Sequence, residues 1–303
     1  MEIISSQLKS DLEIPKNSSK FISLYLLFAI GFKGGQELSH SEFNLEVSNS
    51  IVFGIGLAAL VPVYTFFTLS RKLSIENSGA IAAAYGSISA VTFITTISFL
   101  ELHNMEYGGY MVAVMALMEA PAIIVGVFLI RLYSRERDQR TVNYRKIIFH
   151  ALTNGSVLMV LGSLVIGLLA NESQAAGIAP FTTDIFKGFL AIFLLDMGIT
   201  SGREIKVFFK KGWFPFLFAI VVPIINGVAI AYLSGFFLDS LGNRLLMSIL
   251  AASASYIAVP EAMRMVVPKA SPSLYVPMAL AVTFPFNITL GMPLYLFIIK
   301  LSV

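Results

Sequence analysis

Two pairs of serines lie in the middle of apolar segments, and they are the residues of this chain best suited to bind a small polar solute. The two stretches that hold them are Gly86-Ser87-Ile88-Ser89 and Ser253-Ala254-Ser255-Tyr256. The Ser-x-Ser core repeats at an offset of 166 residues. Because each segment is apolar enough to cross a membrane as a helix, these hydroxyls would lie at mid-membrane depth. We interpret them as a paired polar site that the rest of the chain holds together.

Both stretches carry residues that favour an interrupted helix. Gly86 relaxes the backbone before the first pair, and Pro260 limits helix after the second pair. In lipid, a break survives only where protein, water or a ligand meets the freed backbone groups. If both helices break and cross, their half-helix N-termini favour an anion, and the freed carbonyls favour a cation. The pattern therefore predicts a site for a small anion together with sodium, with substrate contacts at the two stretches named above.

Several oxygen-bearing residues near these stretches are candidate ligands for the cation. Glu119 lies midway along an apolar segment and precedes Pro121, while Pro285 and Asn287 occupy the corresponding region of the second half. An ionisable residue at such a depth is a functional hypothesis by default, and hard cations prefer oxygen ligands. The predicted sodium ligands are Ser87, Thr92, Glu119, Ser255 and Asn287.

Each of these residues also has a structural interpretation. Small residues at helix contacts often serve only to let backbones approach, so the serine pairs could be packing. Glu119 could be protonated, or bonded to a neighbouring helix for stability alone. Asp196, near one end of its segment, fits packing or solvated access as well as binding.

The composition is that of a polytopic membrane protein. Hydrophobic residues make up 56% of the 303 residues and charged residues only 13%, about half the charged fraction of soluble domains. The basic residues fall in short loops rather than along one face, so the net charge of +3 does not indicate nucleic-acid binding. The absence of cysteine excludes disulfides and thiolate chemistry. No motif of an intramembrane enzyme or of a nucleotide-driven pump occurs, so we expect a protein that is not an enzyme, has no cofactor and uses an ion gradient.

Apolar runs of membrane-spanning length predict nine helical spans, and the loop charges orient them. The spans are expected at about 21–35, 50–69, 79–100, 107–131, 147–170, 183–200, 213–237, 244–263 and 274–299. Lys and Arg collect in alternate loops, including Arg71-Lys72 and the segment 132–146, whereas the other loops carry Glu. Since basic loops stay on the cytoplasmic side, we predict a cytoplasmic N-terminus and an external C-terminus.

The two halves of the chain repeat four landmarks in the same order. Gly31, Val61-Pro62, Ser87 and Pro121 are matched by Gly198, Val222-Pro223, Ser253 and Pro285. The predicted topology gives the two halves opposite orientations, which is typical of secondary transporters. We therefore predict an all-α polytopic membrane protein with two inverted-topology repeats of five helices and crossed discontinuous helices. The first repeat is 1–131, a basic cytoplasmic loop is 132–146, and the second repeat is 147–303.

The assignment carries two further expectations, one on the number of spans and one on the helix ends. The first repeat has four spans and the second has five, so either the start of the chain lacks a helix or the protein works with nine. Gly35 and Gly202, in the matched glycine motifs, are expected to end their helices.

The chain resembles the sodium-dependent bicarbonate transporters first known from cyanobacteria, as a bacterial relative outside the cyanobacterial group. The resemblance covers nearly the whole chain. It is carried by Ile14-Pro15, Gly31-x-x-Gly-Gly35, Tyr85-Gly-Ser-Ile-Ser-Ala90, Glu119-Ala-Pro121, Ala252-Ser-Ala-Ser255 and Ala270-Ser-Pro272-Ser-Leu-Tyr275. It implies ten spans in two inverted repeats, a core with crossed broken helices, a scaffold that forms a homotrimer, and cotransport of bicarbonate with sodium. It also implies residence in the bacterial inner membrane and a cytoplasmic regulator similar to PII proteins.

Two departures from the family pattern bear on these expectations. Tyr256 stands where cyanobacterial members have an aspartate, which removes a charge beside the predicted site. The first helix of the family is also absent from this chain. Three other functions therefore stay open: transport of another small organic anion, cation/proton exchange with Glu119 as the carrier, and a non-transporting membrane sensor or scaffold.

Overall fold

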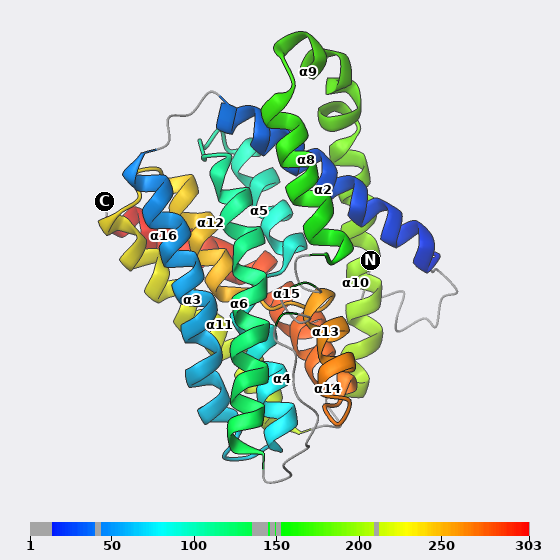
Figure 1. Cartoon of the computed structure of the whole chain (residues 1–303), viewed down its shortest axis with the longest axis vertical. Helices are drawn as coiled ribbons and strands as arrows, with labels where there is room; N and C mark the ends of the chain where they lie inside the picture. Colours follow the sequence, from blue (N-terminus) through cyan, green and yellow to red (C-terminus); the bar gives the residue numbers. More distant parts are fainter. Residues whose placement is uncertain are drawn as a thin grey trace.

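The computed structural model describes residues 14–39, 44–134, 145, 149, 153–208 and 212–302, and throughout these ranges the chain is helical without a β-strand (Figure 1). This confirms the predicted all-α class. The first half contains α2 (Lys16–Ser39), α3 (Leu45–Leu69), α4 (Ile75–Gly86), α5 (Ala90–Leu102) and α6 (Tyr110–Tyr133). The second contains α8 (Gly155–Leu169), α9 (Glu172–Ala179), α10 (Phe186–Phe208), α11 (Trp213–Leu233), α12 (Leu241–Ala252) and α13 (Ala258–Val266).

The last helical segment, Pro272–Leu301, is nearly continuous but irregular. It consists of α14 (Pro272–Pro277), α15 (Phe284–Phe286) and α16 (Met292–Leu301), separated by the π-helical turns Met278–Thr283 and Asn287–Gly291. Such turns often lie at functional sites. The predicted basic loop 132–146 lies mostly outside the described residues.

Six helical segments in the described ranges are long and apolar enough to cross a membrane. They are Leu45–Leu69, Ile75–Leu102, Tyr110–Tyr133, Glu172–Glu204, Trp213–Phe236 and Pro272–Leu301, and α8 and α12 are apolar but shorter. These segments confirm a polytopic membrane protein. The nine-span count and the inverted repeat stay predictions.

Two of the predicted spans are interrupted. The chain leaves helical geometry between α4 and α5 at residues 87–89, and between α12 and α13 at residues 253–257. Gly86 ends α4 against α3, where a Cβ would overlap with the Pro62 ring, so only glycine fits there. Pro260 lies in the first turn of α13, where its missing N–H costs nothing. Its ring would clash with the Tyr256 carbonyl if the helix continued upstream.

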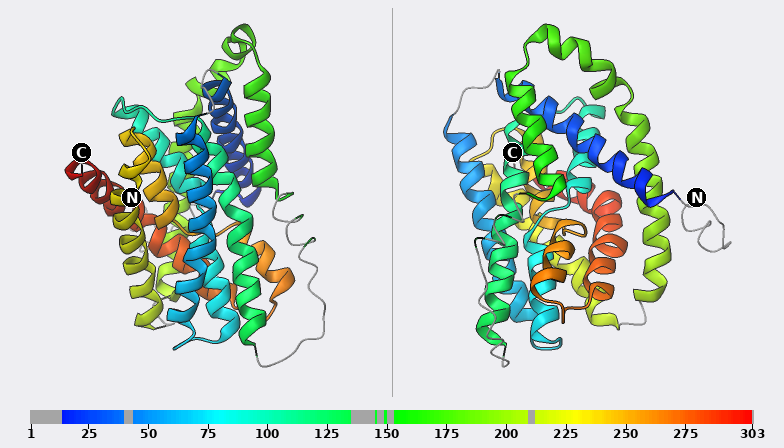
Figure 2. Two further views of the ribbon diagram at one scale, coloured as in Figure 1. Left: turned by 60° about the vertical axis from the view of Figure 1, so that its left-hand side comes forward. Right: turned by 45° about the vertical axis from the view of Figure 1, so that its right-hand side comes forward.

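The helices form two groups that meet beside these interruptions. One group is α2, α8 and α10, with α2 packed extensively on α8 and α10 packed both on α2 and on the last helical segment; the other consists of α3 to α6 and α11 to α16. We call them the α2–α8–α10 group and the core group. Figure 2 shows α9 at the top of the molecule between α8 and α10, with α2 crossing diagonally below it.

The glycines of α2 serve this packing and do not end the helix. A Cβ at Gly35 would overlap with the Leu164 carbonyl of α8, and α2 continues to Ser39. α10 likewise continues past Gly202 to Phe208. The prediction that Gly35 and Gly202 end their helices is therefore wrong, because at least Gly35 is needed for close helix approach rather than for a left-handed cap.

Candidate functional site

The two interrupted helices are joined directly at their breaks. The backbone N–H of Ser89 donates to Ser253 Oγ at 3.0 Å, and the N–H of Ser255 donates to the carbonyl of Ala84 at 2.8 Å. All four residues are buried. Each break therefore supplies a partner for backbone groups that the other break frees, as the low-dielectric interior requires.

Two asparagines cover the carbonyl end of α12. Asn287 Nδ2 donates to the carbonyl of Ala252 at 2.8 Å, and Asn226 Nδ2 donates to the carbonyl of Ala251 at 3.0 Å. Asn287 Oδ1 also accepts from Tyr295 Oη at 3.1 Å. Both polar groups of Asn287 are thus bonded inside the protein, where they position the end of α12.

The four serine hydroxyls differ in the hydrogen bonds that they already make within the protein. Ser253 Oγ accepts from Ser89 and donates to the carbonyl of Leu250 at 3.1 Å, so its proton is already bonded. Ser89 Oγ accepts from the N–H of Thr92 at 3.2 Å, and Ser255 Oγ accepts from the N–H of Val259 at 3.3 Å. The hydroxyl protons of Ser89 and Ser255 have no acceptor of hydrogen-bond geometry among the described residues, so both can donate to a ligand.

Three further hydroxyls near the two breaks are buried and have no hydrogen-bond partner in the part of the chain that the structure describes. They are Ser87 Oγ, Thr92 Oγ1 and Tyr256 Oη. The Tyr256 hydroxyl lies near Ser89, but the two do not reach hydrogen-bond geometry. A buried polar group without a partner is costly, and three of them at one place indicate a ligand that completes their bonding.

A small cavity of about 30 Å³ lies on this crossing. Its polar lining consists of Ser89, Ser255, Tyr256, Glu119 of α6, Ser23 of α2 and Ser156 of α8. Glu119 is only 6% exposed and its carboxylate has no hydrogen bond among the described residues. No basic side chain lines this cavity. Since about 15 Å³ is enough for one water, the cavity has room for one or two water-sized ligands.

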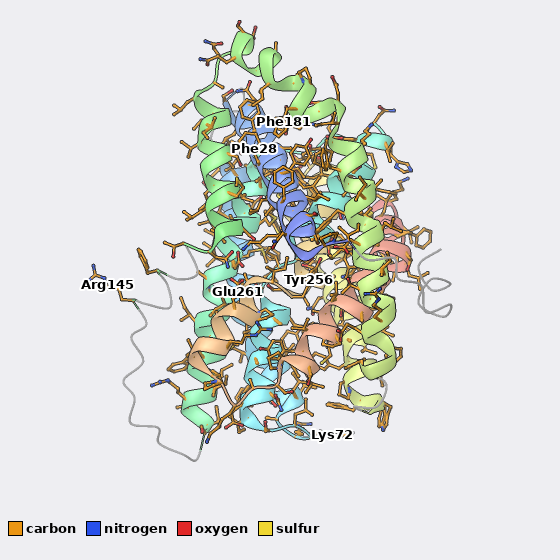
Figure 3. All side chains as sticks on the ribbon, turned by 90° about the vertical axis from the view of Figure 1, so that its right-hand side faces the viewer. Phe28, Lys72, Arg145, Phe181, Tyr256 and Glu261 are labelled. Carbon is orange, nitrogen blue, oxygen red and sulfur yellow. The ribbon has the colours of Figure 1, made fainter. Side chains whose placement is uncertain are left out.

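A larger cavity of about 840 Å³ adjoins the small one and separates the two helix groups. Four residues line both cavities: Ser23, Ser156, Tyr256 and Ile257. Charged residues of both signs line the larger cavity: Lys20, Asp196, Arg203, Glu204 and Glu261. In Figure 3, Tyr256 and Glu261 lie near mid-height, well away from Lys72 at one end of the molecule.

The other side of the site is closed by contacts between the helix groups. Lys33 Nζ of α2 lies 3.3 Å from Glu101 Oε1 near the end of α5. Nearby, Gly34 and Gly109 bring α2 against the start of α6 so closely that a Cβ on Gly109 would overlap with the Gly34 carbonyl. These contacts bring the two helix groups together away from the larger cavity.

The whole chain was compared with known proteins. A family model described as the Na⁺-dependent bicarbonate transporter superfamily matches residues 1–300. The chain belongs to this superfamily. A comparison with curated proteins finds no match. Membership of the Na⁺-dependent bicarbonate transporter superfamily confirms the resemblance drawn from motifs along the whole chain and makes the chain a membrane transporter.

The structure brings together some of the predicted site residues of this superfamily member and separates others. Ile88, Ser89, Ser255, Tyr256 and Glu119 line one cavity. Ser87, Thr92, Ser253 and Asn287 are buried, and neither they nor Gly86 and Ala254 line either cavity. Asp196 accepts a hydrogen bond from Ser19 Oγ and lines the larger cavity.

Several polar residues of the two cavities were not predicted from the sequence, among them Ser23, Ser156 and Glu261. Ser23 and Ser156 come from α2 and α8, and nothing in their local sequence marks them. Glu261 directly follows Pro260, and an acid just after a predicted break was the available signal.

Proposed function

We propose that this superfamily member is a secondary active transporter that carries bicarbonate, or a similar small anion, together with sodium. The observation that carries the proposal is the set of unpartnered hydroxyls beside an unpartnered carboxylate, all at the crossing of two broken helices. The superfamily supports sodium and bicarbonate as the solutes.

In this proposal the hydroxyls hold the anion. Ser89, Ser255 and Tyr256 donate to its oxygens, and the N-termini of α5 and α13 add the favourable end of the helix dipole. The small cavity alone is too small for bicarbonate and sodium together. The anion therefore extends past Tyr256 toward the larger cavity, which the shared lining of the two cavities supports.

Glu119 couples the two solutes. An ionised Glu119 would repel an anion bound nearby, because charges interact strongly away from water. Sodium on the Glu119 carboxylate offsets this repulsion, so each ion raises the affinity for the other, as cotransport requires. Ser87 and Thr92 are the further sodium ligands in this proposal, through hydroxyl oxygens that have no partner in the protein.

Movement between the two helix groups would give alternating access. The structure is open toward the larger cavity and closed at Lys33 and Glu101, which is one end state of such a cycle. We place the larger cavity on the cytoplasmic side, since Lys20 and Arg203 line it and basic residues collect on that side. The chain has no cysteine, so single cysteines report sidedness cleanly. A cysteine at Lys72 should resist an impermeant reagent in intact cells, and ready labelling there would reverse the assignment.

One observation favours a second function, cation/proton exchange. Glu119 is buried without a hydrogen bond, and such a carboxylate suits a proton carrier in a cation/proton exchanger. Uptake of labelled bicarbonate into proteoliposomes separates the two. Uptake that follows an inward sodium gradient and fails with a proton gradient alone supports symport; proton-driven sodium movement without bicarbonate supports exchange.

A further inference from the structure

The outer contact between the two helix groups contains a carboxylate that the proposed function does not use. Glu37 follows Lys33 by four residues in α2, so both side chains project from the same face of that helix. Across the contact, Lys33 Nζ pairs with Glu101 Oε1 at 3.3 Å. The face of α2 that carries Glu37 therefore meets a second carboxylate, which belongs to the core group.

Glu37 also lies where the two helix groups pack tightly. A Cβ on Gly109, at the start of α6, would lie only 2.8 Å from the Cβ of Glu37. One oxygen of the Glu37 carboxylate, Oε2, is buried. Separation of α2 from Gly109 would open this contact to water.

We propose that Glu37 makes the outer contact sensitive to pH: the contact is closed while Glu37 is protonated, and it opens when Glu37 ionises. The inference rests on the alternating access of the proposed function, because it names the group that controls the outer opening step. It gives a regulatory role to a residue that lines neither cavity.

The charges around Glu37 give the direction of the effect. With Glu37 protonated, the charges of Lys33 and Glu101 balance each other. An ionised Glu37 loses hydration in the closed contact, and it adds a second negative charge that repels Glu101 beside a single lysine. Ionisation therefore destabilises the closed contact, and separation of the helix groups relieves both costs.

The other ionisable groups near this contact are a tyrosine and an exposed histidine. Burial and the nearby carboxylates raise the pKa of Tyr107, in the loop before α6, so its phenol stays neutral. His103 is exposed at the end of α5. α8, which packs on α2, has no ionisable side chain, and α10 places the ring of Phe186 against Lys33. Glu37 and His103 are therefore the groups that the experiment must separate.

The pKa of Glu37 places the transition near neutrality. Glu37 lies beyond the predicted span of about 21–35, and burial, followed by the charge of Glu101, raises its pKa from 4.5 to about 7 in the closed contact. In a solvated open state the pKa returns toward its ordinary value, so opening releases a proton. Rising pH therefore favours opening up to about pH 7 and has no further effect above it. Dissolved carbon dioxide also converts to bicarbonate as the pH rises, so the contact opens where the substrate of the proposed function is present.

The test measures labelling of a single cysteine at Ala90, which lines the small cavity, by an impermeant reagent outside intact cells. The external pH is varied between about 5 and about 8, on both sides of the expected transition. Each rate is divided by the rate of Glu37→Gln with the same cysteine, which cancels the ionisation of the thiol itself. Glu37→Ala, which also cannot titrate, replaces Glu37→Gln if the latter does not fold.

Two variants serve as controls. Glu172 is the matched acid, because it is exposed in the first turn of α9, two residues after Ala170, whose carbonyl accepts from Gln36 beside Glu37. Glu172→Gln therefore removes a carboxylate at the same end of the molecule without touching the contact. His103→Gln removes the histidine that titrates in the same pH range.

We expect the wild-type labelling ratio to rise about tenfold with pH and to level off above about 7, since one unit of pKa difference between two states is tenfold in their equilibrium. Glu172→Gln and His103→Gln should show the same rise. A flat wild-type ratio overturns the inference, as does a rise that is lost in either control variant.

Sodium-driven uptake of labelled bicarbonate into proteoliposomes separates this inference from the proposed function. Uptake by wild type together with a flat labelling ratio leaves the proposed function standing and overturns the inference alone. Absence of sodium-driven uptake overturns the proposed function, and the labelling ratio then still decides whether Glu37 controls the contact.

Discussion

Ser89 and Ser253 are joined by a hydrogen bond of 3.0 Å that runs from the backbone of one broken helix to the side chain of the other. The bond gives the two serine pairs unequal roles. The Ser253 hydroxyl bonds Ser89 and Leu250 and so joins the two breaks. The Ser89 hydroxyl accepts from Thr92, and its proton is available to a ligand. The two motifs match in sequence and differ in chemistry.

Replacing Ser253 with alanine should therefore reduce stability more than it reduces substrate contact. The variant leaves the buried N–H of Ser89 without its acceptor, a loss of about 1–3 kcal/mol of unfolding free energy. Thermal unfolding in detergent measures it, with Ser271→Ala as an exposed control whose hydroxyl bonds only Ser273. Unchanged unfolding in Ser253→Ala would contradict the assigned role.

Tyr256→Phe should weaken anion binding without reducing stability. The change removes a buried hydroxyl that has no partner, so stability should stay the same or rise. The half-saturating anion concentration should rise about twofold to tenfold, the value of one lost hydrogen bond. Tyr275→Phe is the matched control, because its hydroxyl is also buried and unpartnered but lines neither cavity. Equal uptake by both variants would show that Tyr256 donates nothing to the anion.

The sequence predicted the breaks well because their causes are local. Gly86 and Pro260 restrict the backbone at defined positions, and the apolar flanks fix the depth of the serines. Glu119 was found for a similar reason, since a charge inside an apolar segment is visible without any tertiary information.

Other features depend on helix packing and could not be predicted. Gly35 reads as a helix end, but the structure shows that it lets α8 approach α2. Asn287 reads as an ion ligand, but its amide is bonded to Ala252 of another helix. Ser23 and Ser156 reach the small cavity only because α2 and α8 pack beside the crossing. The cavity shared by two helix groups exists only in the assembled fold.

The Lys33–Glu101 ion pair should hold the outer side closed. Both side chains are about a quarter exposed, so the pair favours the closed state by up to about 1 kcal/mol. In a variant with one cysteine at Ala90, which lines the small cavity, Lys33→Ala should speed labelling from the outside by up to about fivefold. The charge reversal Lys33→Glu with Glu101→Lys should restore the slow rate.

A lysine of another helix provides the control for this experiment. Lys300→Ala removes a lysine near the end of α16 that takes part in no ion pair among the described residues. If Lys300→Ala labels as fast as Lys33→Ala, or if the double reversal stays fast, the ion pair does not hold the outer side.

The most direct test of the central claim is sodium-driven uptake of labelled bicarbonate by Ser89→Ala and Ser255→Ala in proteoliposomes. Each variant removes a hydroxyl donor with a free proton and keeps the small volume that helix packing needs. We predict that the half-saturating anion concentration rises between about threefold and a hundredfold, since the lost bond is to a charged ligand. Each variant should also lose about 0.5–2 kcal/mol of unfolding free energy, because the buried N–H of Thr92 or Val259 loses its acceptor. Uptake equal to wild type in both variants, across a range of sodium and bicarbonate concentrations, would contradict the claim that the paired serines bind the solute.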